Sequence, residues 1–346
     1  MAGVRARGEE IRRYILDHVE KSPGDVTKAT AERFGITRQA VNKHFRRLQA
    51  DGVLRRSGNT RASVYRLAPQ SQWSHACEIE PGLAEDVVWR RDVRAVLGDL
   101  PNNVLEIWHY GFTEMFNNAI DHSDGSLIGL QIKKTVATTE MLISDDGYGI
   151  FRKVQAAMGL LDERHSILEL SKGKLTTDPT RHTGEGIFFT SRMFDLFDIL
   201  SGNVYFSHKF ADAQDWILEP ARTSSGTSVW MKLNNHTART AKRIFDEFSS
   251  EDDYEFSKTV VPARMAQYGE DKLISRSQAR RLLARVELFK TVLFDFSEVE
   301  TIGRAFADEI FRVFALQHPD IELLPIHANS ETRRMIARAQ HGSQGQ

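Results

Sequence analysis

The sequence predicts a multidomain α/β protein with a small α+β unit at the N-terminus, a larger α/β sandwich, and a small α/β unit at the C-terminus. The chain has 346 residues, which is long for one hydrophobic core. Residues 1–68 carry 15 lysines and arginines against 7 acidic residues, a net charge of +8, whereas the remainder carries 31 against 40, a net charge of −9. From residue 254 onward, strand and helix patterns alternate, as in a small α/β sheet.

The composition is typical of a soluble globular protein, with 41% hydrophobic and 27% charged residues. No apolar run approaches the roughly 20 residues of a membrane span, and the charged N-terminus lacks a secretory core. Cys77 is the only cysteine, which excludes an internal disulfide and a cysteine-rich zinc site. The sequence therefore predicts a cytoplasmic protein with no membrane partner and a structural thiol.

The first 68 residues predict three helices followed by a hairpin. Apolar residues recur at helical spacing, and Thr37 is a good N-cap for the third helix, where Val41, Phe45 and Leu48 would point inward. Gly52 is expected to end that helix. The helices are expected over residues 8–21, 26–34 and 38–51, and the hairpin strands over 53–57 and 62–67.

This succession resembles a winged helix-turn-helix, in which the third helix reads the major groove of double-stranded DNA. Arginine can address guanine there, and glutamine or asparagine can address adenine, while wing arginines would meet phosphate. A winged-helix module that binds protein is the alternative, and the basic excess favours DNA. The predicted DNA-contacting residues are Arg38, Gln39, Asn42, Lys43, Arg46 and Arg47 on the helix, with Arg55, Arg56 and Arg61 on the wing.

Residues 69–82 are polar and predict a linker, and residues 83–100 predict a helix that leads into the middle part. A second helical linker is expected over 236–250, before an acidic run. The predicted division is a DNA-binding unit over 1–68, a linker with connecting helix over 69–101, the sandwich over 102–235, a helical linker over 236–253, the C-terminal unit over 254–340 and a tail over 341–346.

The middle part opens with a predicted helix over residues 111–123. Glu114, Asn118 and Asp121 stand at i, i+4 and i+7, beside an apolar face, so that three polar groups share one stripe. An amide oxygen is a hard ligand for magnesium, and a carboxylate can polarise water. An ordinary core helix with a polar flank is the alternative for this segment taken alone.

Three glycine-containing segments follow in order. A buried strand over 140–144 ends in Asp145, and Gly147 and Gly149 come directly after it. Gly184 and Gly186 precede an apolar helix, whose free N–H groups could meet phosphate. The run 225–229 is a glycine turn that enters a strand. Each segment alone is a weak signal, but their order over about 115 residues is strong.

That order resembles the Bergerat ATP-binding fold of gyrases, histidine kinases, mismatch-repair ATPases and certain chaperones, over residues 102–233. The resemblance implies ATP and magnesium as cofactors. It implies Glu114 as the general base of hydrolysing members and Asn118 as the magnesium ligand. It also implies that Asp121 lies near the nucleotide and that Asp145 binds adenine.

By the same resemblance, Gly147 and Gly149 shape the base pocket, Gly184 and Gly186 line the phosphates, and Thr227 supports the adenine end. Residues 150–182 would then form a lid. Within the lid, Lys172 and Lys174 are candidate phosphate contacts, but solvated surface charge is the preferred interpretation of both. The glycine box departs from the family pattern because its first position is His182, whose imidazole would meet the nucleotide instead.

The C-terminal unit predicts strands over 257–261, 291–296 and 321–326, with helices over 275–288, 303–316 and 330–340. This layout resembles the STAS-like family of unknown function and is similar to anti-sigma-factor antagonists, whose partners are Bergerat-fold serine kinases. Such antagonists carry a phosphorylatable serine at the start of the helix that follows the Asp295-type strand, and Ile302-Gly303-Arg304 holds that place here. A docking or dimerisation module for a protein partner is therefore the preferred interpretation.

The leading hypothesis for function is a DNA-binding transcriptional regulator that responds to ATP. The alternative is an enzyme, either an ATPase or an anti-sigma-type serine or histidine protein kinase. His109 precedes the Glu114 helix without a phosphoacceptor hairpin, so we expect it to be a packing or surface residue. A third hypothesis is a scaffold whose nucleotide segments are vestigial. Homodimerisation is expected only by analogy with winged-helix and Bergerat proteins.

Overall fold

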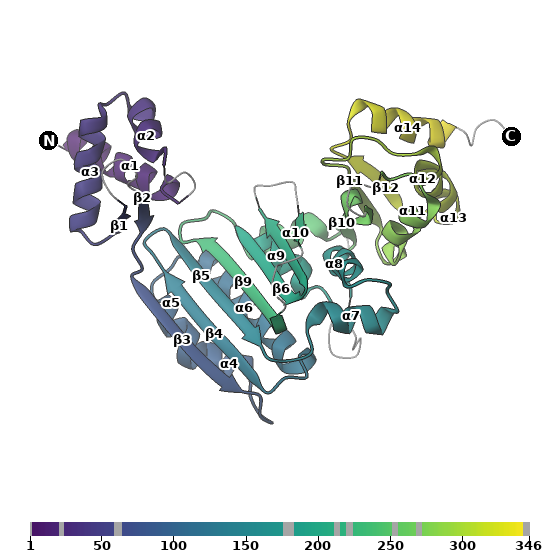
Figure 1. Cartoon of the computed structure of the whole chain (residues 1–346), viewed down its shortest axis with the longest axis horizontal. Coiled ribbons are helices and arrows are strands. Elements are labelled where there is room, and N and C mark those ends of the chain that lie inside the picture. The colour runs from purple at the N-terminus through teal and green to yellow at the C-terminus, as the bar shows by residue number, and fades with distance from the viewer. Residues whose placement is uncertain are drawn as a thin grey trace.

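A computed structural model of the chain describes residues 2–20, 24–58, 64–175, 183–210, 215–218, 224–250, 255–267 and 272–341. Figure 1 shows three parts, with the N-terminal and C-terminal units on opposite sides of a long central sheet. Within the described residues, no helix has both the length and the apolar character needed to cross a membrane.

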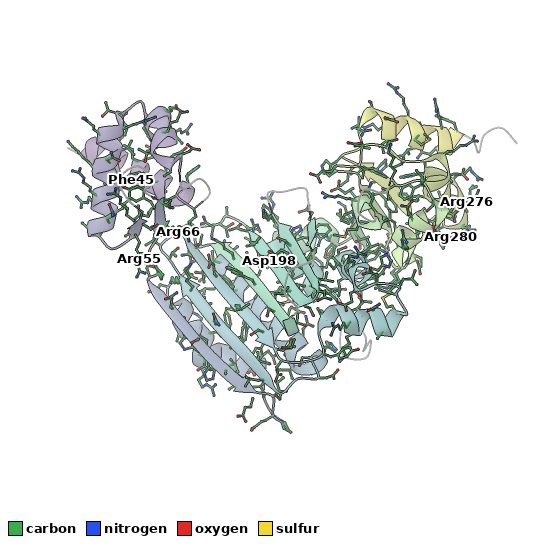
Figure 2. All side chains as sticks on the ribbon, in the orientation of Figure 1. Phe45, Arg55, Arg66, Asp198, Arg276 and Arg280 are labelled. Atoms are coloured by element: carbon green, nitrogen blue, oxygen red, sulfur yellow. The ribbon has the colours of Figure 1, made fainter. Side chains whose placement is uncertain are left out.

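The N-terminal unit contains helices and a two-stranded antiparallel sheet around its own core. Phe45 lies at its centre (Figure 2), 1% exposed, and its ring is 4.3 Å from that of Tyr65. The predicted cap is confirmed, because Oγ1 of Thr37 accepts a hydrogen bond from the N–H of Ala40 at 3.2 Å. The elements are α1 (Ala2–His18), α2 (Val26–Phe34), α3 (Arg38–Ala50), β1 (Leu54–Ser57) and β2 (Val64–Leu67).

The described residues of the central unit form a seven-stranded sheet in the order β3-β4-β5-β9-β6-β7-β8, with antiparallel pairing throughout. Inward positions alternate with outward ones along β4 and β5, which is the pattern of a sheet with one covered face. The strands are β3 (Ser71–Glu78), β4 (Leu127–Lys134), β5 (Thr138–Asp145), β6 (Leu196–Gly202), β7 (Val204–Lys209), β8 (Asp215–Leu218) and β9 (Ser224–Asn234).

Helices lie behind this sheet in Figure 1, while its other face is turned toward the viewer. The predicted helix over 83–100 is present as one run, with a π-helical turn in its middle. The helices are α4 (Glu85–Val88), the turn η1 (Trp89–Val93), α5 (Arg94–Leu97), α6 (Asn102–His122), α7 (Ile150–Met158), α8 (Glu163–Lys172), α9 (Gly186–Met193) and α10 (Ala241–Phe248).

Helix α6 supplies the largest share of the central core. Trp108, Phe112 and Phe116 are fully buried, and the rings of Phe112 and Phe116 stack at 5.0 Å. Burial of each large apolar side chain contributes about 1.5–3 kcal/mol relative to exposure. The apolar stripe of α6 is therefore held firmly against the sheet.

The prediction of a polar linker over 69–82 was wrong, because β3 occupies most of it and pairs with β4 along its whole length. An edge strand uses its backbone on one side only, and β3 is mostly exposed, so its sequence carries little apolar alternation. The short connection from β2 is pinned at both ends. The N–H of Ala68 donates to the carbonyl of Val53 at 2.8 Å, and that of Gln70 to the carbonyl of Lys134 at 2.7 Å.

The predicted helical linker over 236–250 is in part a core element. In α10, the ring of Phe245 packs 4.6 Å from Phe189, and that of Phe248 packs 5.0 Å from Phe188. This helix therefore completes the layer that α9 begins, and the sandwich extends beyond residue 235.

The N-terminal unit contacts the central sheet directly. Lys232 of β9 binds Glu20 at 2.8 Å and Glu140 at 3.0 Å. The side chains of Lys232, Glu20 and Glu140 are mostly buried, with exposed fractions of 25%, 26% and 14%. The turn between β4 and β5 adds Val136 and Ala137 to the hydrophobic cluster of the N-terminal unit. The two units therefore share a charged contact and an apolar one.

The C-terminal unit confirms the predicted alternation of strands and helices. Its strands are parallel in the order β10-β11-β12, and Ser275 and Gln278 form a capping box at the start of α11. Its elements are β10 (Lys258–Pro262), η2 (Ala263–Ala266), α11 (Arg276–Leu283), η3 (Val286–Leu288), β11 (Thr291–Asp295), α12 (Arg304–Asp308), η4 (Glu309–Phe314), α13 (Ala315–Gln317), β12 (Glu322–Ile326) and α14 (Ser330–His341).

Close packing of α6 gives a stability prediction. A Cβ atom at Gly111 would lie 2.5 Å from Cε2 of Phe194, in a core where Phe194 is fully buried. Gly111→Ala is therefore expected to lower the free energy of unfolding by roughly 1–2 kcal/mol, because overpacking outweighs the gain in helix propensity. Urea denaturation measures the change.

The matched control is Gly8→Ala in α1, where the nearest atom lies 3.5 Å from the added carbon and only helix propensity changes. We expect this control to be neutral or slightly stabilising. Equal effects of the two substitutions would contradict the packing described for α6.

Candidate functional site

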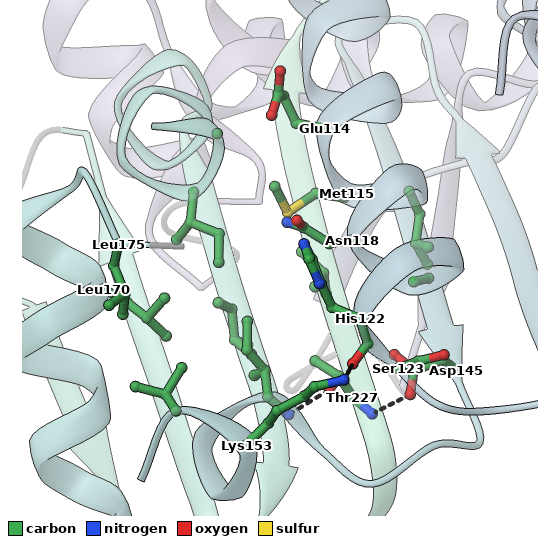
Figure 3. A pocket seen from close by; sticks show the side chains of 18 of the residues that line it. Glu114, Met115, Asn118, His122, Ser123, Asp145, Lys153, Leu170, Leu175 and Thr227 are labelled. Carbon is green, nitrogen blue, oxygen red and sulfur yellow. Dashed lines mark hydrogen bonds between the residues drawn. The ribbon is translucent and has the colours of Figure 1, made fainter. Parts of the chain in front are cut away.

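A cavity of about 260 Å³ lies between α6, the sheet, and the segment from α7 to the start of α9. Figure 3 shows Glu114 at one end of it, Asn118 in the middle and Asp145 at the other end. The volume approaches the range of small-molecule sites, roughly 300–1,000 Å³. Apolar walls come from residues such as Met115, Ile143 and Val229, so a few polar groups face an otherwise apolar space.

Helix α6 contributes its polar edge through Glu114, Asn118 and His122 at i, i+4 and i+8. The prediction that Asp121 belongs to this edge was wrong: its side chain is exposed and does not line the cavity. Each residue turns the helix by about 100°, so Asn118 and His122 are rotated from Glu114 by about 40° and 80° in one direction. Asp121 is rotated by about 20° in the opposite direction, away from them. The third member is His122, which the sequence reasoning missed.

Asp145 lies at the end of β5 and is fixed by backbone donors. Its Oδ1 accepts hydrogen bonds from the N–H of Gly147 at 3.0 Å and of Thr227 at 3.1 Å. The hydroxyl oxygen of Thr227 accepts in turn from the N–H of Ile150 at 3.0 Å. Among the described residues, none donates to Oδ2 of Asp145. One carboxylate oxygen therefore anchors the turn, and the other is available to a ligand.

Burial raises the pKa of Asp145 above its ordinary value, and the N–H groups of Gly147 and Thr227 partly oppose that rise. The neighbouring Asp146 has a different role, because its carboxylate accepts hydrogen bonds from the backbone of Ser126 and Leu127. Of the two consecutive aspartates, only Asp145 lines the cavity.

The glycines around the cavity are required by close approach. A Cβ atom at Gly147 would lie 2.0 Å from the carbonyl oxygen of Ser123, and one at Gly186 would lie 2.1 Å from Oε2 of Glu114. Gly149 has φ of 96°. Gly147 and Gly149 shape the turn behind Asp145 without lining the cavity, whereas Gly184 and Gly186 form part of its wall.

Glu114 faces the start of α9, close to a second carboxylate. Burial raises its pKa above the ordinary value, and the nearby Glu185 raises it further. Tyr110, one turn earlier on α6, is partly buried, and burial together with the charges of Glu114 and Glu185 raises its pKa. Among the described residues, none donates a hydrogen bond to Glu114, so its carboxyl group faces the cavity with a raised pKa and no donor to oppose that rise.

The lysines predicted in the lid lie elsewhere, so the prediction of phosphate contacts there does not fit the structure. Lys172 is fully buried and its ammonium is directed into the C-terminal unit. Lys174 donates to Glu255 at 3.3 Å and to the carbonyl of Leu288 at 3.2 Å. Neither lysine lines the cavity. His182 lies outside the described residues.

The basic group on the cavity wall is instead Lys153, in the first turn of α7. Its Nζ donates to the carbonyl of His122 at 2.8 Å (Figure 3) and also to Asp124 at 2.7 Å. The sequence signal that could have found it is its place four residues after Gly149, where a new helix begins next to the turn that follows Asp145. Residues 150–182 were predicted only as a lid, with no role assigned to Lys153.

The residues present fit a magnesium ion that is shared with a ligand. Among the described residues, no group of three or more His, Cys, Asp or Glu side chains is arranged to hold a metal. Magnesium is usually held by one or two protein oxygens together with phosphates and water. Asn118, on the cavity wall, can supply such an oxygen.

The predicted DNA-contacting residues of α3 are all exposed: Arg38, Gln39, Asn42, Lys43, Arg46 and Arg47. Arg47 makes a long contact with Asp51, at 3.7 Å. Arg55 and Arg56 are exposed on β1, and Arg55 is paired across the hairpin with Arg66 (Figure 2). Arg61 lies outside the described residues.

Residues 278–333 match the STAS-like domain of unknown function (DUF4325). The match runs from within α11 to the first turn of α14, so the C-terminal unit is STAS-like as the sequence predicted. A comparison with curated proteins finds no match to this chain. Of the three residues 302–304 predicted to hold the place of the antagonist serine, Ile302 is 2% exposed and forms a β-bridge to Leu273, and Arg304 begins α12.

The raised pKa of Glu114 gives a prediction for stability against pH. A carboxyl group whose folded-state pKa lies above its unfolded value loses its stabilising contribution as the pH rises through the folded pKa. Glu114→Gln is therefore expected to raise the free energy of unfolding at neutral pH and to leave it unchanged below about pH 4. Denaturation curves at several pH values measure this difference.

Glu106→Gln is the control, because Glu106 is an exposed carboxylate on the same helix. Its effect should be small and should not grow with pH. A Glu114→Gln protein that is less stable than the wild type at neutral pH would contradict this prediction, because favourable contacts of the carboxylate would then outweigh its desolvation.

Proposed function

We propose that the protein is an ATP-responsive DNA-binding regulator, in which a winged helix-turn-helix is controlled by a Bergerat-type nucleotide site. The convergence of Glu114, Asn118 and Asp145 on one cavity carries this proposal. Glu114 and Asn118 lie on one helix, whereas Asp145 ends a strand that follows later in the chain. Their side chains suit the binding of a nucleotide with magnesium. Their assembly with an exposed basic helix in the same chain supports a nucleotide-controlled reader.

In the proposed complex, the free oxygen of Asp145 accepts a hydrogen bond from the exocyclic amine of adenine, and the apolar walls enclose the base. The phosphates extend toward Gly184, Gly186 and the first N–H groups of α9, where the helix dipole favours negative charge. Asn118 would hold the magnesium ion, which neutralises phosphate charge when bound.

For DNA, the proposal places α3 in the major groove and the hairpin against the backbone. The net charge of +8 over residues 1–68 supplies non-specific attraction, and the side chains of α3 would supply base contacts. The C-terminal unit would dock a protein partner.

Control of one site by the other requires that ATP bind two arrangements of the chain with different affinity. The contact of Lys232 with Glu20 is a physical connection through which such a difference could reach the N-terminal unit, because β9 also carries Thr227 at the cavity. Fluorescence anisotropy with a DNA library, with and without ATP and magnesium, tests the proposal. Unchanged DNA affinity would contradict it.

ATP hydrolysis is the second candidate function, and Glu114 favours it. A carboxyl group with a raised pKa at the phosphate end of the cavity is suited to accept a proton from water. Protein kinase activity has less support. The place expected for the antagonist serine is held by Ile302-Gly303-Arg304, which carries no hydroxyl group, and the ring of His109 packs 4.8 Å from that of Trp89. Phosphate release by the wild type and by Glu114→Ala distinguishes a hydrolase from a binder.

Asp145→Asn gives a sharp test of the nucleotide site. Asparagine can still accept the two backbone hydrogen bonds, but its amide group would present a donor to the amine of adenine. We expect the affinity for ATP to fall roughly 10- to 150-fold, the equivalent of one charge-assisted hydrogen bond. Isothermal titration calorimetry measures it.

GTP is the matched ligand for this variant, since guanine carries an acceptor where adenine carries the amine. The preference for ATP over GTP should shrink or reverse in Asp145→Asn. Equal loss of both nucleotides would indicate that the turn has collapsed, and no loss of either would remove Asp145 from the proposed site.

Arg46→Ala tests the DNA surface. If Arg46 contacts phosphate, binding should weaken for all sequences, and the slope of log affinity against log salt should fall by about one. Arg13→Ala, an exposed arginine on α1, removes the same charge from the same unit and serves as the control. A larger effect of Arg13→Ala would place the DNA on another face.

A further inference from the structure

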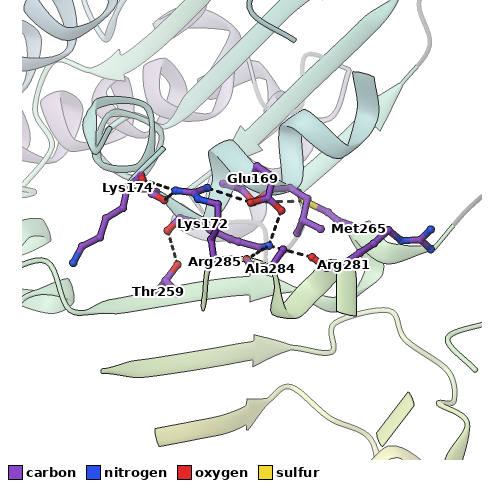
Figure 4. Close-up of polar contacts among 11 residues, drawn as sticks. Glu169, Lys172, Lys174, Thr259, Met265, Arg281, Ala284 and Arg285 are labelled. Carbon is purple, nitrogen blue, oxygen red and sulfur yellow. Dashed lines mark hydrogen bonds and ion pairs between the residues drawn. The ribbon is translucent and has the colours of Figure 1, made fainter. Parts of the chain in front are cut away.

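Helix α8 faces the cavity on one side and the C-terminal unit on the other. Leu170, together with Leu175 just beyond the helix, forms part of the cavity wall. Glu169 and Lys172 point away from the cavity, toward α11 and the turn that follows it (Figure 4). A single short helix therefore joins the wall of the candidate site to the STAS-like unit.

Lys172 forms the centre of this joint. Its side chain is fully buried, and Nζ donates to Glu169 at 2.8 Å, to the carbonyl of Ala284 at 2.7 Å and to the carbonyl of Arg281 at 3.2 Å. The backbone carbonyl of Lys172 also accepts from Oγ1 of Thr259 in β10 at 2.7 Å. The charge is thus buried only because residues from two units satisfy it together.

Arg285 makes the matching contact from the C-terminal unit. Its guanidinium binds Glu169 at 3.1 Å and the carbonyl of Gly173 at 3.2 Å, and it also donates to the carbonyl of Lys174. Arg285 has φ of 63°, a left-handed conformation that is strained for a residue with a side chain. Lys174 and Gly173 opposite it also have positive φ, at 53° and 80°. The contacts of the guanidinium hold this strained pair of turns together.

The cavity wall cannot open at α8 without breaking this joint. Because the C-terminal unit lies on the far side of α8, movement of Leu170 away from the cavity would push Glu169 and Lys172 against the turn after α11 and displace them from their partners. Each displaced group would leave a charge or carbonyl buried without a hydrogen bond. The neighbouring Ser171 adds a weaker contact to Met265. The cost of opening is therefore set by residues more than 100 positions further along the chain.

We propose that the C-terminal unit clamps the wall of the nucleotide cavity, and that Lys172 and Arg285 are the positioning residues through which it does so. The clamp slows entry and release of the ligand, and a ligand in the cavity tightens the joint in return, because coupling between sites is reciprocal. The nature of the ligand, ATP, rests on the function proposed above; the clamp on α8 does not.

Arg285→Gly is the variant that separates a clamp from a structural contact. It removes the guanidinium and at the same time allows the left-handed backbone without strain, so the melting temperature should stay close to that of the wild type. Lys172→Met, which keeps an apolar chain in the buried site, is the second variant. Lys242→Met is the matched control, because Lys242 is 80% exposed and pairs with Asp246 away from the joint.

Two measurements on the full-length protein test the proposal. Amide hydrogen exchange over residues 163–175, without nucleotide, should accelerate about tenfold or more in Arg285→Gly and Lys172→Met, the change expected for loss of one charge-assisted hydrogen bond. The release rate of a fluorescent ATP derivative should rise by a similar factor. Lys242→Met should change neither rate.

Unchanged exchange over 163–175 in Arg285→Gly would overturn the clamp. A general rise in exchange across all three units, with a lower melting temperature, would also overturn it, because the residues would then be merely structural. If the wild type binds no ATP derivative, the proposed function fails, while faster exchange confined to α8 still supports the clamp.

Discussion

The burial of one face of α6 against the central sheet is the constraint on which the cavity depends. Trp108, Phe112 and Phe116 have no freedom to rotate out, so the adjacent edge of the helix is fixed in direction. Glu114 and Asn118 stand on that edge and face the cavity for the same reason. Packing sets their positions. The carboxyl group of Glu114 stays desolvated because the helix cannot rotate to expose it to water. The sheet then brings Asp145 to the opposite end.

Sequence patterns predicted most elements and the residues at both ends of the cavity, since these depend on local periodicity and on glycine. The helix α2 was predicted with its observed bounds, and Thr37 as a cap was confirmed. The predictions failed where a residue's structure depends on segments that are distant in the sequence. The strand β3 is recognisable only from its partner β4, and Lys172 resembles a surface lysine until Ala284 and Glu169 are placed beside it. Neither the pairing of β3 with β4 nor the contacts of Lys172 can be recognised from the residues' own positions in the sequence.

The central unit meets each of its neighbours through a lysine that bridges two segments. Lys232 contacts Glu20 of the N-terminal unit, and Lys172 contacts the turn after α11 of the C-terminal unit. The two lysines differ in surroundings: Lys232 keeps a quarter of its side chain exposed, whereas Lys172 has none, and burial lowers the pKa of Lys172 to about 8. The joint at α8 is therefore the more sensitive of the two to loss of a partner.

The connection between β2 and β3 has a geometric consequence for any DNA complex. Three residues, 68–70, join the hairpin to the sheet, and hydrogen bonds to Val53 and Lys134 hold the chain at both ends of this segment. An N-terminal unit attached in this way has no flexible linker on which to move relative to the sheet. If two chains bound together, the separation and rotational phase of their half-sites would be dictated by how the sheets are juxtaposed, with no flexible spacer to absorb an altered spacing.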